Sequence, residues 1–282
     1  MTSTKQIMKA MNLVAASKLQ RSKEHMEEIS PMFSEIKRIM DGIPHTDEAA
    51  ENIFLVQRAV KNTALVIITS DRGLCGGYNQ NIAREAMKAM KGKNEKLITV
   101  GIKGWEYFRR GKKNIIERNE GASDATFYDD AQYYGAKLVD MYRKGEIDEA
   151  YVAYTRFETM LSHVPTVEKI LPVTVGHAVS VGHAVAVGHD DPGAPSAAEP
   201  MEYESGIDAF LEHAVPMYLN VFLYGAMVES AVCEQAARMM SMDSAASNAE
   251  EIIEELTLVY NRQRQGIITQ ELNEIVSGAN AL

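Results

Sequence analysis

The first forty residues repeat apolar side chains at the spacing of a helical stripe. Ile7, Met11 and Val14 step by four and three, and four further apolar residues continue these steps in the second half of the segment. The residues between them are mostly Ala, Leu, Met, Lys and Glu, which are strong helix formers. The pattern predicts a helix over about 3–41, and Pro31 is expected to kink it or to mark a hinge.

A second stripe of the same period occupies the other end of the chain. It consists of Ile253, Leu256, Tyr260 and Ile267 and then, after a shift of one residue, of Ile268, Leu272 and Ile275. No proline follows Pro216, so we expect a helix from about 206 to the C-terminus, which would span roughly 110 Å. That length is several times the diameter of a small domain, so a partner must surround part of the helix.

Between the two stripes the pattern changes to short runs rich in Val, Ile, Thr and Tyr. These runs predict strands over 64–70, 96–102, 149–159 and 166–173, with helices over 79–90 and 129–144. Alternation of strands and helices implies a largely parallel, Rossmann-like sheet covered on both faces. The predicted fold class is therefore α/β, with the α/β domain inserted between two long terminal helices.

We divide the chain accordingly into three parts: an N-terminal helix over 1–60, an α/β domain over 61–205 and a C-terminal helix over 206–282. The segment 174–200 differs from the rest because a hexad beginning VGH repeats in it. The repeat places His177, His183 and His189 six apart, so that an extended chain would present them on one face to a divalent metal. The row lacks carboxylate or thiolate partners at fixed spacing, which favours a surface loop over a metal site.

Composition narrows the possible classes of protein. The chain is 46% hydrophobic and 24% charged, as in ordinary folded proteins, and its net charge of −10 argues against nucleic acid as a partner. The uncharged stretch 214–228 is too short and too interrupted to cross a bilayer, and no cleavable apolar run follows Met1, so we expect a cytoplasmic location. Cys75 and Cys233 fit no metal or redox spacing and are expected to be reduced, buried thiols.

The charges are unevenly distributed. Residues 1–25 carry five cations against the single acid Glu24, whereas nine acids stand against three arginines from residue 225 onward. The two ends have complementary charge, so the two terminal helices could lie side by side.

A glycine-rich turn, SDRGLCGGYN over 70–79, follows a buried predicted strand and opens a predicted helix. Turns of this kind hold phosphates in α/β folds, but these glycines match neither standard phosphate-binding pattern. Asp71, Arg72 and Cys75 could supply an acid, a cation and a thiol, yet no histidine adjacent in sequence could activate the thiol. A structural turn is favoured over an enzymatic role, and no other catalytic motif occurs, so we expect no catalytic residue, no metal and no cofactor.

Three segments in this order resemble the gamma-subunit family of the F-type ATP synthase, bacterial type. They are KAMNLVAASKLQRS over 9–22, ITSDRGLCGGYN over 68–79, and ESAVCEQAARMMSMDSAASNA with RQGIITQELNEIVSGA over 229–279. The resemblance covers nearly the whole chain except the histidine-containing insert. It implies that the terminal helices form an antiparallel coiled coil inside a ring of alpha and beta subunits, as the central rotor shaft of a proton-driven ATP synthase.

The resemblance also implies partners and contact residues. The α/β domain would stand beside epsilon (the delta-type stalk subunit) and the c ring, on the cytoplasmic side of the cell membrane, and the catalysis would belong to the beta subunits. The expected beta-subunit contacts are Lys9, Met11 and Lys18 on the first helix and Arg264, Gln265, Thr269 and Glu271 on the last. The expected c-ring contacts are Tyr203 and Glu204.

Two other classes of protein compete with the rotor interpretation. One is a nucleotide-dependent enzyme built on the α/β domain, which would have no need of two long helices of complementary charge. The other is a free-standing coiled-coil adaptor, which would pair with itself through longer, uninterrupted heptads.

Overall fold

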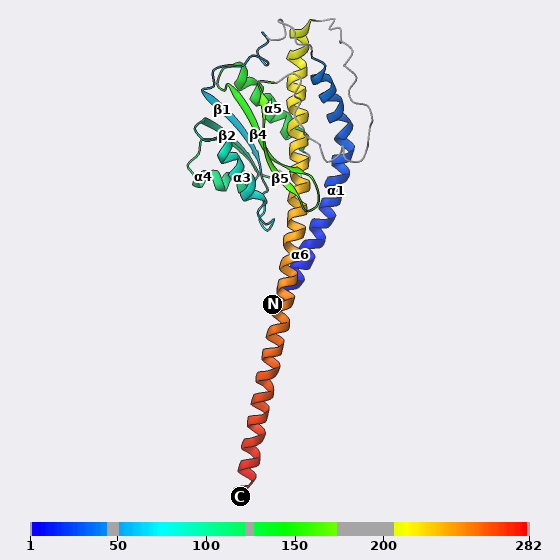
Figure 1. The fold of residues 1–282 in the computed structure, drawn as a ribbon, viewed down its shortest axis with the longest axis vertical. Helices are drawn as coiled ribbons and strands as arrows, with labels where there is room; N and C mark the ends of the chain where they lie inside the picture. The colour runs from blue at the N-terminus through cyan, green and yellow to red at the C-terminus, as the bar shows by residue number, and fades with distance from the viewer. Residues whose placement is uncertain (1, 44–50, 122–126, 174–205, 281–282) are drawn as a thin grey trace.

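The computed structural model describes residues 2–43, 51–121, 127–173 and 206–280. Two long helices, α1 (Thr2–Asp41) and α6 (Ile207–Asn280), run antiparallel beside a smaller α/β part (Figure 1). The side-chain amide of Asn12 donates a hydrogen bond of 2.9 Å to the carbonyl oxygen of Met239. Farther along the pair, His25 Nε2 and the Tyr224 hydroxyl share a hydrogen bond of 2.6 Å. The basic start of the chain and the acidic part of α6 therefore do lie side by side, as their complementary charges suggest.

Neither helix ends at its internal proline. Pro31 lies inside α1, and Pro216 lies inside the 74-residue α6. A proline removes one backbone hydrogen bond from a helix, and packing against a neighbour compensates for that loss. The expected long C-terminal helix is confirmed.

The α/β part contains a five-stranded sheet in the order β3-β2-β1-β4-β5. The strands are β1 (Asn62–Ile68), β2 (Asn94–Val100), β3 (Ile115–Asn119), β4 (Glu149–Phe157) and β5 (His163–Leu171). The first four are parallel, and β5 lies antiparallel to β4 at one edge. The helices between them are α3 (Tyr78–Ala89), α4 (Ile102–Arg110) and α5 (Phe127–Arg143). The predicted fold class, a mostly parallel sheet between long terminal helices, is confirmed.

Two elements, β3 and α4, were not predicted. The strand β3 reads IIERN, and only its first two residues are apolar because it is a partly exposed edge strand. The predicted strand over 96–102 extends two residues too far, since β2 ends at Val100. Gly101, with a φ of 93°, turns the chain there into α4, and a Cβ at this position would overlap the backbone of Thr69. A glycine that permits this turn ends the strand.

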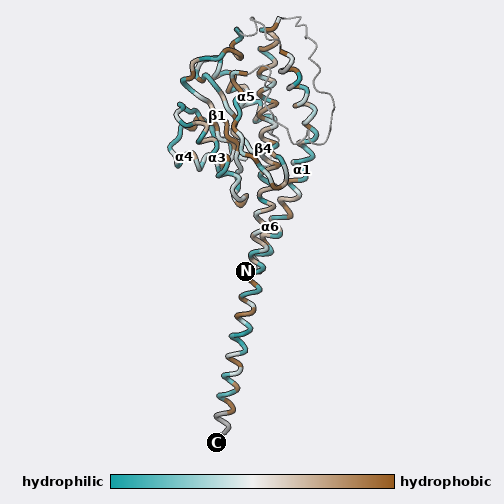
Figure 2. Tube along the Cα trace, viewed as in Figure 1, coloured by the Kyte–Doolittle hydropathy of each residue, from teal (hydrophilic) through white to brown (hydrophobic). Residues whose placement is uncertain are grey.

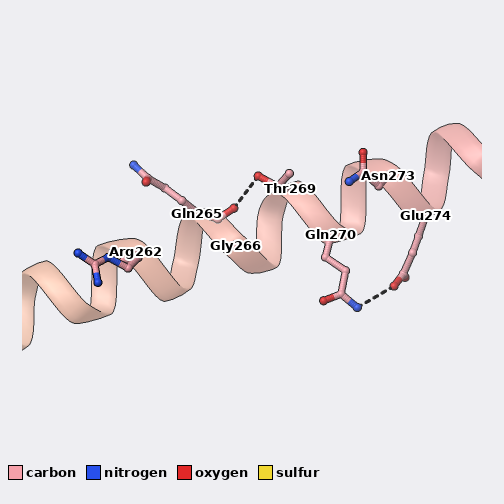
Figure 3. A pocket seen from close by; sticks show the side chains of 7 residues that line it. All are labelled: Arg262, Gln265, Gly266, Thr269, Gln270, Asn273 and Glu274. Carbon is pink, nitrogen blue, oxygen red and sulfur yellow. Dashed lines mark hydrogen bonds between the residues drawn. The ribbon is translucent and has the colours of Figure 1, made fainter.

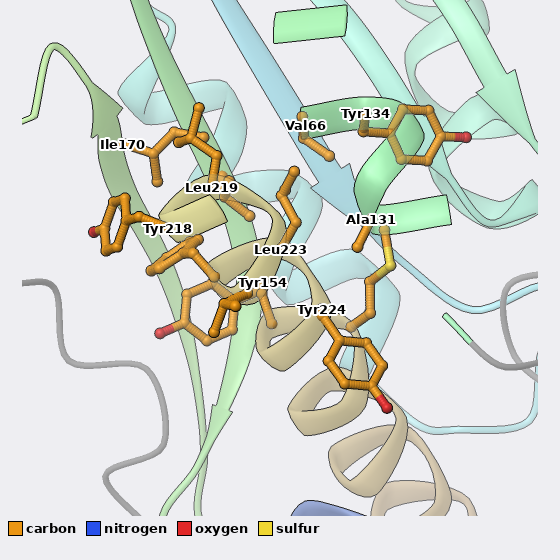
Figure 4. Packing of buried hydrophobic residues seen from close by; sticks show 14 of the residues in the cluster. Val66, Ala131, Tyr134, Tyr154, Ile170, Tyr218, Leu219, Leu223 and Tyr224 are labelled. Carbon is orange, nitrogen blue, oxygen red and sulfur yellow. The ribbon is translucent and has the colours of Figure 1, made fainter. Parts of the chain in front are cut away.

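The residues of β1 alternate between two apolar layers. Leu65 and Ile67 point to the side covered by α3 and α4, where Phe108 is also buried. Val66 and Ile68 point to the side covered by α5 and α6. Figure 4 shows Leu223 of α6 close to Val66 in that second layer, to which Leu219 also belongs. The sheet is thus covered on both faces, as its apolar strands require.

The two halves of α6 have different surroundings. The half that we name the paired segment (207–250) packs on the sheet, α5 and α1, and a single buried cluster joins residues of α1, the sheet and α6. By length and composition α6 could cross a membrane, but 83% of its most apolar window is buried inside the protein, as in a core helix. The second half, the distal segment (251–276), projects alone (Figure 1). The division of the chain at 60 and 205 stays a prediction.

Candidate functional site on the terminal helices

The distal segment exposes large apolar side chains along its whole length. Their exposed fractions lie between 41% and 71%, and they are Ile252, Leu256, Leu258, Val259, Tyr260, Ile267, Ile268, Leu272, Ile275 and Val276. Figure 2 shows apolar and polar residues alternating along this part of α6. A run of exposed large apolar side chains along one helix marks an interaction surface.

Four predicted contact residues lie on this segment, and all four are exposed: Arg264, Gln265, Thr269 and Glu271. The Thr269 hydroxyl donates a hydrogen bond of 2.8 Å to the backbone carbonyl of Gln265, one turn earlier. In Figure 3 the side chains of Gln265 and Thr269 project from the same side of the helix. The Gln270 amide donates to Glu274 at 3.1 Å. The polar side chains therefore satisfy part of their hydrogen bonding within the helix and keep other polar atoms available to a partner.

The four residues do not share one face. At 100° per residue, Arg264 and Glu271 fall together in the middle of the apolar stripe, whereas Gln265 and Thr269 fall roughly 130° away round the helix. No single flat surface can contact both pairs. A partner that engages all four residues must wrap round the helix.

Gly266 leaves a gap on the polar side of the distal segment. A Cβ there would meet no atom within 4 Å, and the hollow beside it is lined only by side chains of α6, from Arg262 to Glu274. It is the bare surface of one helix and not an enclosed cavity. A partner could approach the backbone closely at this position.

The N-terminal contact residues lie on α1 beside the paired segment. Lys9 is exposed, and Met11 and Lys18 are half-buried. Near them Lys5 donates a hydrogen bond to Glu250, which lowers the pKa of this carboxyl, and the charge of Lys9 acts in the same direction. Arg264 follows fourteen residues after Glu250, roughly 20 Å along the axis. The two groups of predicted contacts therefore occupy the same shaft at different heights and do not touch.

The remaining predicted positions lie outside the described residues. They are the c-ring contacts Tyr203 and Glu204 and the row of His177, His183 and His189. Among the residues that the structure describes, no group of three or more His, Cys, Asp and Glu side chains could hold a metal ion.

The glycine-rich turn is organised by structural contacts. One Asp71 oxygen accepts from the amide of Ile102 and the other from the amide of Gly121, each at 2.9 Å. Leu74 and Gly76 adopt positive φ angles of 64° and 56°. Burial raises the pKa of the Cys75 thiol, so it stays protonated and is a weak nucleophile. These contacts agree with the predicted structural turn.

Sequence reasoning missed a buried arginine of α6, Arg238, that joins this turn to the helix. Arg238 lies 2.8 Å from Glu234, one helical turn earlier, and only 8% of the arginine is exposed. Its guanidinium also donates to the carbonyl oxygens of Arg72 and Gly73, at 3.3 and 3.4 Å. The sequence signal is a Glu and an Arg four residues apart in a stretch of helix that carries no other charge.

Comparisons with known proteins agree on one family. The family model described as ATP synthase matches residues 1–282. The ATP synthase gamma chain of Alkaliphilus metalliredigens is 35% identical over 287 residues, covering 99% of this chain and 94% of its own length. The sodium-ion-specific ATP synthase gamma chain of Acetobacterium woodii is 37% identical, with the same coverage.

Solved structures show the same fold. The rotor of the Euglena gracilis mitochondrial ATP synthase superposes with a TM-score of 0.66 at 16% identity, covering 95% of this chain and 94% of its own. A chain from the central stalk and c ring of the Tetrahymena thermophila mitochondrial ATP synthase superposes on this chain with a TM-score of 0.61 at 21% identity. The superposition covers 85% of this chain and 99% of the other.

Proposed function

This chain belongs to the ATP synthase gamma-chain family, and on that premise we propose that it couples rotation of a membrane c ring to conformational cycling of the catalytic beta subunits. A gamma chain is a non-catalytic component of the ATP synthase complex. In the proposed mechanism the paired and distal segments form the shaft, and the α/β part is its base. Proton flow would turn the ring and the base together, and the asymmetric surface of the shaft would act on each beta subunit in turn.

The observation that carries this proposal is the exposure of the distal segment. Ten large apolar side chains on one projecting helix are each more than 40% exposed. An isolated helix gains little stability from propensity alone, so a helix of this composition needs a partner along its length. A surrounding ring of alpha and beta subunits would provide one.

The arrangement of the polar residues supports a partner that encloses the helix. Arg264 and Glu271 face one way, and Gln265 and Thr269 face another. On α1, Lys9, Met11 and Lys18 would contact beta at a position on the shaft that is nearer to the α/β part. Because several faces are equipped for contact, rotation of the shaft would bring different side chains to each beta subunit in turn.

The further partners in the proposal are epsilon (the delta-type stalk subunit) and the c ring, met by the α/β part, with Tyr203 and Glu204 as the proposed c-ring contacts. With these partners the chain would lie on the cytoplasmic side of the cell membrane. It would be attached to the membrane through the complex and not by a membrane-spanning segment of its own. The solved structures similar to this chain are central-stalk, c-ring and rotor parts of ATP synthases, which supports the c ring as a partner.

The alternative of a nucleotide-dependent enzyme is not favoured, because Glu229 and Ser230 of α6 accept hydrogen bonds from the amides of Phe157 and Thr155 at the carboxyl end of β4, where such enzymes bind their ligand. The alternative of a self-pairing adaptor is not favoured either. In the paired segment small residues such as Ala246 and Ala249 are buried, so α1 and α6 of the same chain pack closely against each other. This pairing within one chain covers the surface that a second copy would need.

The function is tested by replacing Arg264 and Gln265 together with alanine in the reconstituted complex. Alanine is the best helix former, so the helix stays intact while one charged and one neutral hydrogen-bonding group are lost. Loss of a charged hydrogen bond to beta changes a rate or equilibrium roughly tenfold or more. If the contact forms only in some rotational states, ATP hydrolysis falls while subunit stoichiometry stays unchanged.

A matched control is the double variant Glu254→Ala with Glu255→Ala, which removes two neighbouring exposed polar side chains about 15 Å away on the same helix. The control should assemble and turn over like the parent. Parental turnover in the Arg264 and Gln265 variant would refute the contact assignment, and failure to assemble would give these residues a structural role.

A further inference from the structure

A basic surface covers α4 and β3, although the chain as a whole is acidic. Residues 103–118, which we name the α4–β3 surface, carry six Lys and Arg against two Glu, whereas the whole chain has a net charge of −10. Figure 1 shows α4 on the outer side of the α/β part, away from α1 and α6. None of the contact residues proposed for the rotor lies in this range.

Two arginines of this surface stack on one aromatic ring. The guanidinium carbons of Arg109 and Arg118 lie 4.8 and 4.7 Å from the centre of the Trp105 ring. Trp105 and Arg109 are one turn apart on α4, and Arg118 comes from β3. A guanidinium that stacks on an aromatic ring is held in place and can still donate hydrogen bonds from its edge. Both arginines are exposed, so they present their N–H groups to solvent in a fixed arrangement.

The cations of this surface have few carboxylate partners. Arg118 lies 3.3 Å from Glu120, and about half of each side chain is exposed, so this ion pair is weak. Arg109, Arg110 and Lys112 are exposed, and no carboxylate among the described residues forms an ion pair with them. Like charges that lie close together repel one another, so carboxylates from a partner would be attracted to this surface.

The surface also offers aromatic contact area. Tyr107 is 41% exposed, and Trp105 is half-buried. Tyr107 and Arg110 are three residues apart on α4 and therefore share a face. Trp, Tyr and Arg are the residues that dominate the binding energy of protein–protein interfaces, whereas Lys is depleted there. Arginines beside exposed aromatic rings are therefore typical of a protein-binding surface.

From these features we infer that the α4–β3 surface binds an acidic protein segment. Its carboxylates would accept hydrogen bonds from Arg109, Arg110 and Arg118, since a guanidinium can bind a carboxylate through two parallel N–H groups. An apolar side chain of the segment would lie against the rings of Trp105 and Tyr107. A nucleic acid is disfavoured, because a long polyanion would extend beyond this surface onto the acidic remainder of the chain.

A membrane surface is another source of negative charge. In the proposed function the axis of α6 stands away from the membrane plane. Because α4 lies beside that axis on the outer side of the α/β part, it would face sideways and not toward lipid (Figure 1). This exclusion rests on the proposed function, whereas the choice of an acidic partner rests on the charges and rings of the surface itself.

The single tryptophan of the chain is Trp105, so its fluorescence reports on the α4–β3 surface alone. The test titrates the full-length chain with a synthetic peptide of alternating Glu and Ala and, in parallel, with the same peptide carrying Gln in place of Glu. We expect a saturable change of Trp105 fluorescence with the Glu peptide only, and an affinity that falls as the salt concentration rises. The test needs no other subunit, so its failure would leave the proposed rotor function intact.

The variant Arg109→Gln with Arg118→Gln should weaken binding of the Glu peptide at least about tenfold, because hydrogen bonds from two cations to carboxylates are lost. Since both arginines stack on Trp105, calorimetry replaces fluorescence for this variant. The matched control is Arg21→Gln with Lys144→Gln, which removes two exposed cations from α1 and α5. The control should bind the peptide as the parent does.

If the double arginine variant fails to fold, Arg110→Gln with Lys112→Gln takes its place, since these exposed side chains are not the ones that stack on Trp105. Three results would overturn the inference. The first is equal binding of the Glu and Gln peptides, or of neither. The second is an equal loss of affinity in the arginine variant and the control. The third is a change of Trp105 fluorescence with phosphatidylglycerol vesicles but not with the Glu peptide, which would assign the surface to lipid.

Discussion

The paired and distal segments of α6 belong to one unbroken helix, yet they present opposite surfaces. Along the paired segment, side chains are buried on nearly every side from Tyr218 to Ala236. Along the distal segment, every described side chain but Ile253 is exposed, and the apolar ones form a stripe. A helix with apolar residues all round is covered by neighbours on all sides. A helix with apolar residues along one stripe needs a partner that covers that stripe. The same helix thus serves first as core and then as contact surface.

Polar residues also differ in meaning between the two segments. In the paired segment Glu229 accepts a hydrogen bond of 2.8 Å from the amide of Phe157, and the Ser230 hydroxyl accepts one of 3.3 Å from the amide of Thr155. These buried groups attach the helix to the end of β4. In the distal segment the polar side chains that bond within the described part of the chain do so inside the helix itself. A polar residue in α6 therefore marks an intramolecular joint in one half and a prospective partner contact in the other.

The largest contrast should come from truncating one leucine in each segment. Leu223 is fully buried, so Leu223→Ala should lower the free energy of unfolding by about 2–5 kcal/mol. Leu272 is 57% exposed, and Leu272→Ala should change it by no more than about 0.5 kcal/mol in the isolated chain. Urea unfolding of both variants measures the difference. Equal losses would mean that the distal segment is covered in the free protein.

A smaller contrast should come from one glycine in each segment. A Cβ on Gly225 would overlap the ring of Phe33 on α1, so Gly225→Ala should destabilise the protein by about 1–3 kcal/mol. Gly266 has open space, and Gly266→Ala should stabilise the isolated chain by up to about 1 kcal/mol. Thermal unfolding followed by circular dichroism gives the sign of each change. A stabilising Gly225→Ala would show that α1 and α6 are less closely packed than the structure indicates.

The smallest effect should come from the ion pair at the boundary of the two segments. Lys5 lowers the pKa of Glu250 below its ordinary value of 4.5, so the pair stabilises the fold above that value and loses its effect as the pH falls through the lowered pKa. Lys5→Ala should speed amide hydrogen exchange in the first turns of α1 at neutral pH and have no effect at low pH. Lys5→Arg is the control that keeps the charge. A change independent of pH would exclude the ion pair as the cause.

Much of the fold could be predicted because its signals are local. The stripes at both ends and the apolar runs of β1, β2, β4 and β5 follow directly from side-chain periodicity. The edge strand β3 could not be predicted, because edge strands bury few residues and β3 alternates little. The start of α4 was obscured by Gly101, whose effect depends on contact with Thr69, a residue distant in sequence.

Less of the candidate site could be predicted, because a site depends on which residues the fold brings together. Arg264 and Gln265 are neighbours in sequence, but the helix turns them to different faces, so their adjacency says little about a shared partner. Arg238 looked like one charge among many until its carbonyl partners in the glycine-rich turn were known. The proposed contacts at Lys9, Met11 and Lys18 stay predictions, since they depend on surfaces of other subunits.

The contact of Arg238 with the glycine-rich turn has a mechanical consequence. Rotation passes from one part of a protein to another only where the contact between the two parts does not slip. The Arg238 guanidinium pairs with Glu234 of α6 and donates to the carbonyl oxygen of Arg72 in the turn, and apolar side chains pack around it. Load applied to the sheet should pass into α6 without slack, so elastic twist would accumulate farther along the helix and not at its base.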